Sequence, residues 1–256
     1  MNTRQRIAAA ILSAVVGAGL LICFVRSREP EYQGKRLSVW LAEFDHWKGD
    51  TNAPIVLAIR AFGVQAVPSL IEMCFVNDSN LKQKAAMEFE KRPALMEHRF
   101  TTAPERWNRA QLALRVMGSD ARTALPAFRA ALTNEVAFVR LRAVSALGWI
   151  GPQAEDCLPA LIARRDDQVV RGNLMHALEL IGCRPDLCVP VLIGALDDAD
   201  PIVRQNAVHA LGTFGAQAST AVPALTKALA DKATARRAAD ALKKIQTDES
   251  VTNQRL

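Results

Sequence analysis

Residues 200–231 have the sequence DPIVRQNAVHALGTFGAQASTAVPALTKALAD, and versions of this stretch recur upstream in the chain. Its first half predicts a helix with one apolar face, formed by Val203, Ala207, Leu211 and Phe214. Its second half predicts another helix, with an apolar face formed by Val222, Leu225 and Leu229. Neither helix buries its apolar face alone, so we expect copies of the pair to stack and share one core.

Five glycines mark these copies, at spacings of 55, 33, 31 and 33 residues: Gly63, Gly118, Gly151, Gly182 and Gly215. Glycine adopts the left-handed conformation that commonly ends a helix, so each is predicted to end a first helix. A proline is predicted to open each second helix, where its missing N–H would be unpaired in any case. These prolines are Pro68, Pro126, Pro159, Pro190 and Pro223. The sequence therefore predicts an all-α fold, a right-handed α-solenoid of about five helix pairs.

The pattern divides the chain into parts. Residues 1–28 are predicted to be a membrane anchor, and residues 29–50 a linker and a capping helix with Ser38 as its N-cap. The cap is expected to cover the open end of the first repeat with five apolar residues: Leu37, Trp40, Leu41, Phe44 and Trp47. The solenoid is predicted to span residues 51–246 and to end in a half-repeat. A disordered tail is predicted for residues 247–256.

The N-terminal segment Ile7–Val25 has nineteen residues without a charge. As a helix it would be about 28 Å long, which is enough to cross the hydrocarbon core of a bilayer. No A-x-A-like cleavage site follows its apolar region, which favours an uncleaved, single-pass membrane helix over a cleaved signal peptide. Arginines flank both ends, and N-in insertion would place the large domain outside the cytoplasm. The alternative, a cleaved signal, predicts a secreted or periplasmic protein.

Composition narrows the function classes. The formal net charge is +6, but acidic and basic residues alternate along the chain. Nucleic-acid-binding proteins usually cluster their basic residues, so no nucleic-acid partner is expected. The chain has one tyrosine and half of its residues are apolar, which favours helices, and no strands are expected. The five cysteines lack metal-ligand spacing, and Cys183 and Cys188 are either buried free thiols or, outside the cytoplasm, a disulfide.

The first glycine spacing exceeds one repeat by about 22 residues, which predicts an insert at residues 76–103. Its apolar residues suggest an added helix that Pro93 breaks. Inserts in solenoids often carry function, but a spacer that changes the curvature of the stack is an equal alternative.

Two sets of residues recur at fixed repeat positions. Arg140, Arg171 and Arg204 form a predicted ladder that would bind phosphate or an acidic peptide, unless nearby acids pair with it locally, which we favour. His176 and His209 are predicted to point to solvent about 10 Å apart, too far to share a metal ion. The sequence has no glycine-rich phosphate loop and no nucleophile elbow. We therefore expect no cofactor, no metal site and no catalytic residue.

The pattern D-x-x-V-R-x-x-A-x-x-A-L-G-x-I/F-G, followed by A-V-P-A-L, resembles HEAT repeats, in particular the short bacterial form described as phycobilisome-lyase-like. The resemblance covers residues 50–246. The lead-in YQGKRLSVWL, behind a membrane anchor, is similar to what precedes such arrays in bacterial proteins. The resemblance implies a HEAT-like or armadillo-type superhelix that binds proteins. Deoxyhypusine hydroxylases, which are HEAT-repeat metalloenzymes, use His-Glu pairs, and no histidine here is followed by glutamate.

The second helices are expected to line the concave side of the solenoid. Residues three or four positions after each opening proline then form the candidate partner-binding face: Glu72, Arg129, Ile162, Ile193, Thr226 and Lys227. The sequence thus predicts a non-catalytic scaffold for protein–protein interaction, tethered to a membrane through residues 7–25, with a protein or peptide partner. The alternative is a lyase-like or metal-dependent HEAT-repeat enzyme, or an enzyme accessory, acting on a protein or a chromophore.

Overall fold

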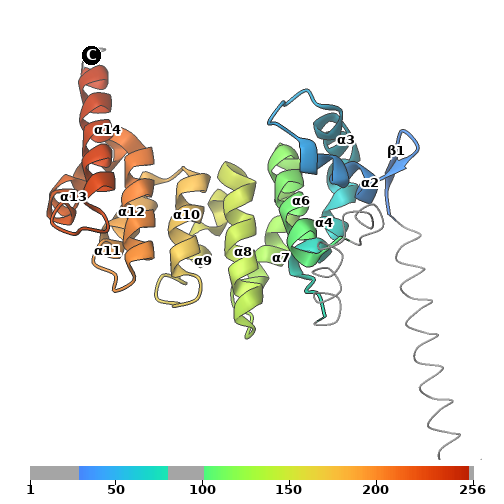
Figure 1. Ribbon diagram of the computed structural model, residues 1–256, viewed down its shortest axis with the longest axis horizontal. Helices are drawn as coiled ribbons and strands as arrows, with labels where there is room; N and C mark the ends of the chain where they lie inside the picture. Colours follow the sequence, from blue (N-terminus) through green and yellow to red (C-terminus); the bar gives the residue numbers. More distant parts are fainter. Residues whose placement is uncertain (1–28, 80–100, 254–256) are drawn as a thin grey trace, which may run out of the picture.

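The computed structural model describes residues 29–79 and 101–253, which form a row of helix pairs (Figure 1). The predicted anchor at residues 7–25 and residues 80–100 of the predicted insert lie outside the described residues. The first helices of the pairs are α3 (Pro54–Phe62), α6 (Ala103–Val116), α8 (Ala137–Ile150), α10 (Arg171–Ile181) and α12 (Pro201–Phe214). The second helices are α4 (Val67–Phe75), α7 (Leu125–Ala131), α9 (Leu158–Ile162), α11 (Pro185–Ala195) and α13 (Val222–Ala228).

The first helices from α6 to α12 lie side by side in chain order, and α14 (Ala235–Asn253) packs on α12 (Figure 1). Buried residues from every pair join in one contiguous apolar core. Stacked helix pairs that share a core are an α-solenoid, as predicted from the repeats. The apolar face predicted for α12 is buried, and Leu211 in its middle is completely inaccessible to solvent.

The five repeat glycines end their helices as predicted, with positive φ angles between 51° and 74°. In four of the five pairs a short 3₁₀ helix follows the glycine: η2 (Gly63–Ala66), η4 (Gly118–Ala124), η5 (Gly151–Cys157) and η6 (Gly215–Ala221). The proline then stands in the first turn of the second helix. In this position it costs no hydrogen bond, because the first N–H groups of a helix have no partner within it.

The fourth pair departs from this pattern. Helix α11 begins at Pro185, so Pro190 lies inside it and does not open it as predicted. Pro185 already has the φ that the first turn of a helix requires, and the segment that is 3₁₀ in other pairs becomes part of the α-helix here. Arg184, just before it, takes the left-handed conformation, with φ 54°.

The N-terminal part forms the predicted cap. A two-residue hairpin, β1 (Glu31–Tyr32) and β2 (Lys35–Arg36), leads into α2 (Leu37–Ala42) and the 3₁₀ helix η1 (Glu43–His46). Leu37, Trp40, Leu41 and Phe44 are buried against the first pair, and Trp47 is half-buried. The hairpin corrects the prediction that no strand is present. Its turn at Gln33 and Gly34 has positive φ at both residues, the geometry that favours tight hairpins.

Three further predictions from the sequence are wrong. Ser38 is inside α2 and does not cap it; instead the Glu29 carboxylate accepts the Ser38 backbone N–H and, at 3.0 Å, its hydroxyl. Leu229 is 40% exposed because α13 ends one residue before it. The tail predicted from Thr247 begins as helix, because α14 continues to Asn253.

Residues Pro54–Phe75 have the length and hydropathy of a membrane span. In the structure, however, Gly63 ends α3 and η2 leads into α4, so the segment is a pair of short helices. The buried residues of both helices belong to the shared core. We therefore assign this segment to the core of the first pair.

One position sets how consecutive first helices meet. We call it the junction position: the residue three before the glycine that ends each first helix, namely Arg60, Arg115, Gly148, Glu179 and Gly212. Each contacts the next first helix: Arg60 Nε donates to Val116 O at 3.2 Å, and the Arg115 guanidinium lies 5.6 Å from the Trp149 ring centre. A Cβ atom at Gly148 would lie 2.9 Å from Ala177 Cα, so the two backbones nearly touch there.

The described ends of the insert meet at one carboxylate. Asp78 is buried, and its side chain accepts the Ala103 backbone N–H at the start of α6. It also pairs with Arg106 at 2.9 Å. Thr102 and Glu105 form a capping box at the same helix end, so the point where the chain re-enters the solenoid is firmly held.

Candidate partner-binding surfaces

The structure divides the six residues predicted to bind a partner into two groups. Glu72, Arg129, Thr226 and Lys227 are exposed. Ile162 and Ile193 are half-buried and pack against the core, because the register of α9 and α11 turns them toward neighbouring helices. The two isoleucines are therefore interior residues rather than a binding surface.

The exposed members of the set make local contacts. Lys227 Nζ lies 2.9 Å from an Asp197 carboxylate oxygen, and the Thr226 hydroxyl donates to Val222 O at 2.8 Å. Arg129 lines an open cavity of about 670 Å³ beside Arg122, Pro126 and Asp156. The structure thus distributes the predicted residues over several sites on the second helices and does not bring them together.

The arginine ladder pairs with aspartates, as the favoured interpretation of the sequence expects. Arg140 lies 2.7 Å from Asp167, and two equivalent pairs follow along the chain: Arg171 with Asp198 at 3.2 Å and Arg204 with Asp231 at 2.9 Å. Each aspartate stands in the loop that leads into the next first helix, and each accepts a backbone N–H two residues further on. The guanidinium of Arg140 lowers the pKa of Asp167.

Two of these ion pairs border grooves. A groove of about 370 Å³ lies at Arg171 and Asp198, and its wall on α11 is made of small residues: Pro190, Val191, Gly194 and Ala195. One repeat further, a groove of about 450 Å³ lies at Arg204 and Asp231, beside Ala224 and Lys227 of α13. Both are open to solvent at the edge of the solenoid where a second helix ends. The two grooves resemble each other because they occupy equivalent positions in consecutive repeats.

The first-helix side carries a polar cluster that the sequence did not predict. Glu179 of α10 lies 3.2 Å from His176 on the same helix and 3.2 Å from His209 on α12, one carboxylate oxygen to each ring. Both histidines are more than half exposed, as predicted, but the Glu179 side chain between them is only 11% exposed. Glu179 stands three residues after His176, a helical spacing that could have indicated their contact, but the contact with His209 of the next repeat has no signal in the sequence.

Charge interactions in this cluster act on both partners. The hydrogen bond to Glu179 raises the pKa of His176 above its ordinary value, despite partial burial. Burial alone would raise the pKa of Glu179, but the hydrogen bond with His176 and the nearby His209 outweigh it and lower the pKa. In the described part of the chain, no group of three or more His, Cys, Asp or Glu residues is arranged to hold a metal ion.

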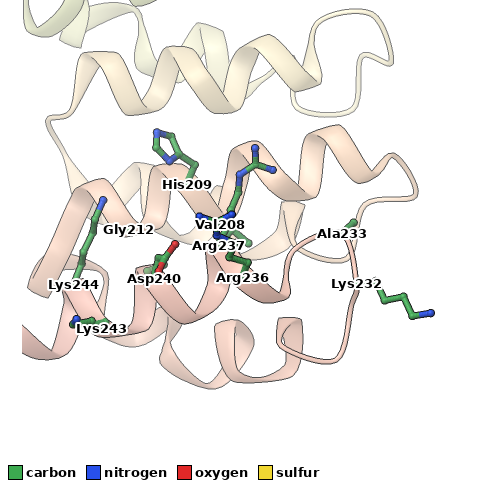
Figure 2. A pocket seen from close by; sticks show the side chains of 11 residues that line it. Val208, His209, Gly212, Lys232, Ala233, Arg236, Arg237, Asp240, Lys243 and Lys244 are labelled. Carbon is green, nitrogen blue, oxygen red and sulfur yellow. The ribbon is translucent and has the colours of Figure 1, made fainter.

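A basic groove of about 640 Å³ lies between α12 and α14 (Figure 2). Small residues lie at the closest approach of the two helices, where a Cβ atom at Gly212 would be 3.1 Å from Ala241 Cβ. Five cations line the groove: Lys232, Arg236, Arg237, Lys243 and Lys244. His209 and one carboxylate, Asp240, complete its polar surface. The signal in the sequence was the pair of doublets in α14, RR and KK, which composition alone does not distinguish from a solvated helix face.

The described cysteines are free thiols: Cys74, Cys157, Cys183 and Cys188. The Cys188 thiol donates a weak hydrogen bond to Cys183 O at 3.5 Å. Burial raises the pKa of Cys74 and of Cys188 to about 12, so both stay protonated near neutral pH. The free-thiol alternative is confirmed for these four residues, and Cys23 lies outside the described residues.

A search of the curated proteins finds no match. Among solved structures, the chain is similar to a designed armadillo repeat protein at 20% identity and a TM-score of 0.42, covering 70% of this chain and 99% of that one. It is also similar to human deoxyhypusine hydroxylase in complex with glycerol at 17% identity and a TM-score of 0.41, covering 77% and 82%. These similarities are too low to transfer any function.

A family model described as HEAT repeats matches residues 93–179 and residues 158–243. Together the two matches span more than half of the chain, from the insert to α14. They include the repeat glycines and junction positions of four consecutive pairs and the three ladder arginines. The chain belongs to the HEAT-repeat family.

Proposed function

We propose that this chain is a non-catalytic scaffold that binds a protein partner along the edge of its solenoid. HEAT and armadillo repeats typically serve protein interaction, and the observation that carries the proposal is the recurrence of the edge grooves. Arg171–Asp198 and Arg204–Asp231 frame equivalent grooves one repeat apart, each lined by small residues of a second helix. Such spacing suits an extended segment of a partner that crosses several repeats.

The test fills one groove without disturbing the fold. A Cβ atom at Gly194 would have nothing within 4 Å, so Gly194→Trp places a large side chain in the groove beside Arg171. The control is Gln217→Trp, at an exposed position in η6 of the next helix pair. We expect crosslinking in native membranes to recover a partner with wild type and with the control variant, and to lose it with Gly194→Trp.

If the same proteins are recovered with all three chains, the edge grooves are not the partner-binding site. A measurement of thermal unfolding accompanies the experiment, so that loss of binding by an intact solenoid is distinguished from loss of structure. The melting temperatures of both variants are expected to stay close to that of wild type.

We further propose that residues 7–25 anchor the scaffold in a membrane, with the solenoid outside the cytoplasm; cleavage of this segment would give a secreted or periplasmic protein. The uncharged run and its flanking arginines support the anchor. Alkaline extraction of membranes is expected to leave the chain in the pellet, and mass spectrometry of its N-terminus to show the intact segment. A mature N-terminus beyond Val25 would establish the secreted alternative.

The metal-dependent or lyase-like alternative makes its own prediction. Elemental analysis of the purified full-length chain would then find stoichiometric iron or zinc, and loss of the metal would lower the unfolding temperature. For the scaffold we expect neither. Glu179 with its two histidines is the first place to substitute if a metal is found, because it is a described cluster in which two histidines meet a carboxylate.

A further inference from the structure

We propose that the basic groove between α12 and α14 binds a carboxylate-rich segment of a partner protein. The inference rests on the proposed scaffold function and assigns one site and one ligand chemistry to it. The groove is separate from the edge grooves, since no residue that lines it also lines one of them.

The groove has a defined shape. Its floor is formed by Gly212 and Ala241, where the backbones of α12 and α14 come close, and Ala233 in the loop before α14 also lines the groove. Long side chains of α14 stand beside this floor. Figure 2 shows Lys232 at one end, Lys243 and Lys244 at the other, and Arg236 and Arg237 between them.

The cations of the groove are largely unpaired, in contrast to the ladder arginines. The ladder arginines and Arg106 and Arg109 all pair with aspartates. Among the described residues, no carboxylate pairs with the charged groups of Lys232, Arg236, Lys243 or Lys244. Arg237 donates a hydrogen bond to Gln205 of α12, which fixes its position without neutralising it. The groove therefore keeps an uncompensated positive charge.

The arrangement favours a carboxylate-rich peptide over other anions. From Arg236 to Lys244 the helix rises about 12 Å, the length of about four residues of extended chain. The cations are spread along this length rather than converging on one point, so they suit several separate carboxylates better than one phosphate group.

Nucleic acid and membrane surfaces fit less well. The eleven residues that line the groove include no Phe, Tyr or Trp, and His209 alone does not make a platform on which successive bases would stack. An amphipathic surface that inserts into a bilayer exposes a large apolar face, whereas the apolar floor here is small and recessed between two helices.

The experiment measures binding of a fluorescent octaglutamate peptide to the full-length chain in mild detergent, with octaglutamine as the neutral probe. The variant Arg236→Glu/Lys243→Glu reverses two groove charges whose side chains are exposed. The control Arg122→Glu/Arg129→Glu applies the same charge change at the cavity beside α7. Thermal unfolding of each chain confirms that the solenoid is intact.

We expect octaglutamate to bind wild type and the control variant, and the groove variant to bind at least about tenfold more weakly. Binding should also weaken as salt rises from about 50 to about 200 mM, because the contacts are exposed charges. Equal binding by both variants, or equal binding of octaglutamine, overturns the proposal. So does tighter binding of oligothymidine or of phosphatidylserine vesicles that the groove variant loses.

The outcome is independent of the edge-groove test. If octaglutamate fails to bind while crosslinking still recovers a partner that Gly194→Trp loses, the basic groove is rejected and the scaffold function stands. If octaglutamate binds in the groove while Gly194→Trp has no effect, the edge grooves are rejected and the basic groove remains a binding site.

Discussion

Helices α8 and α10 occupy equivalent places in consecutive repeats, yet they meet their neighbours differently. At the junction position α8 has Gly148, and its backbone nearly touches that of α10 at Ala177. Helix α10 has Glu179 there, and its carboxylate lies between two histidines. A glycine junction is held by close packing, whereas a carboxylate junction is held by charge and needs partners that satisfy it. The same repeat fold thus accommodates both kinds of junction, but the carboxylate junction requires charged partners that the glycine junction does not.

The largest expected effect comes from Gly148→Ala. Its new Cβ atom would lie 2.9 Å from Ala177 Cα and 3.1 Å from Ala177 Cβ, so a backbone has to move. We expect a loss of about 1 to 3 kcal/mol in the free energy of unfolding, measured by urea denaturation. Gly194→Ala is the matched control, because its Cβ atom has nothing within 4 Å and alanine favours a helix. That variant is expected to gain up to about 1 kcal/mol. If Gly148→Ala left the free energy of unfolding unchanged, α8 and α10 would not be in close contact.

An intermediate effect is expected at the other end of the same two helices. Arg140 of α8 contacts Asp167 and also donates to the carbonyl oxygens of Asn134 and Glu135, at 2.9 and 3.0 Å. Arg171 of α10 has a longer contact with Asp198, and its buried Nε has no hydrogen-bond partner among the described residues. We expect Arg140→Met to lower the free energy of unfolding by about 1 kcal/mol and Arg171→Met by less. Equal losses would mean that the ladder positions contribute alike despite their geometry.

The smallest expected effect is a pH dependence at the Glu179 junction. The pKa of His176 is raised, so its stabilising contribution is complete below about pH 6.5 and is lost as the pH rises through the folded-state value. The pKa of Glu179 is lowered, so its contribution is present above about pH 4.5 and is lost as the pH falls. The junction is therefore strongest between these limits.

The test compares unfolding at pH 6 and pH 8 by urea denaturation. From pH 6 to pH 8, the free energy of unfolding of wild type should fall by a few tenths of a kcal/mol more than that of His176→Gln/His209→Gln. The difference is small because both histidines are exposed. His46→Gln, which changes an exposed histidine of the cap, is expected to keep the wild-type difference. If the double variant shows the same pH dependence as wild type, the charges at Glu179 contribute nothing measurable.

Much of the fold could be predicted from the sequence because glycine and proline have strong local effects. The repeat glycines end helices wherever they stand, and four of the five prolines open one. Pro190 was wrongly predicted to open α11, because Pro185 also favours the start of a helix and stands earlier in the chain. Leu229 was misplaced because the spacing that placed it on the buried face does not show that α13 ends one residue before it.

The binding surfaces were harder to predict because they depend on contacts between repeats. The spacing from the opening proline predicted that Ile162 and Ile193 lie on a surface. That spacing does not show which face of a short second helix packs against its neighbours. The proximity of Glu179 and His209 likewise depends on how α10 and α12 cross. The histidines were predicted to lie about 10 Å apart, and the Glu179 side chain between them contacts both.

Asp78 gives the molecule a tolerance to change in length. Its carboxylate holds the residue where the chain returns, Ala103, next to the residue where it left, and the Arg106 contact secures the same point. Closing a loop costs little more when the loop grows, provided that its ends stay fixed. We therefore expect that segments of other lengths between Ser79 and Thr101 would leave Asp78 and Ala103 in contact. In engineering terms, this is a grafting position where a reporter or a binding loop can be installed in the array.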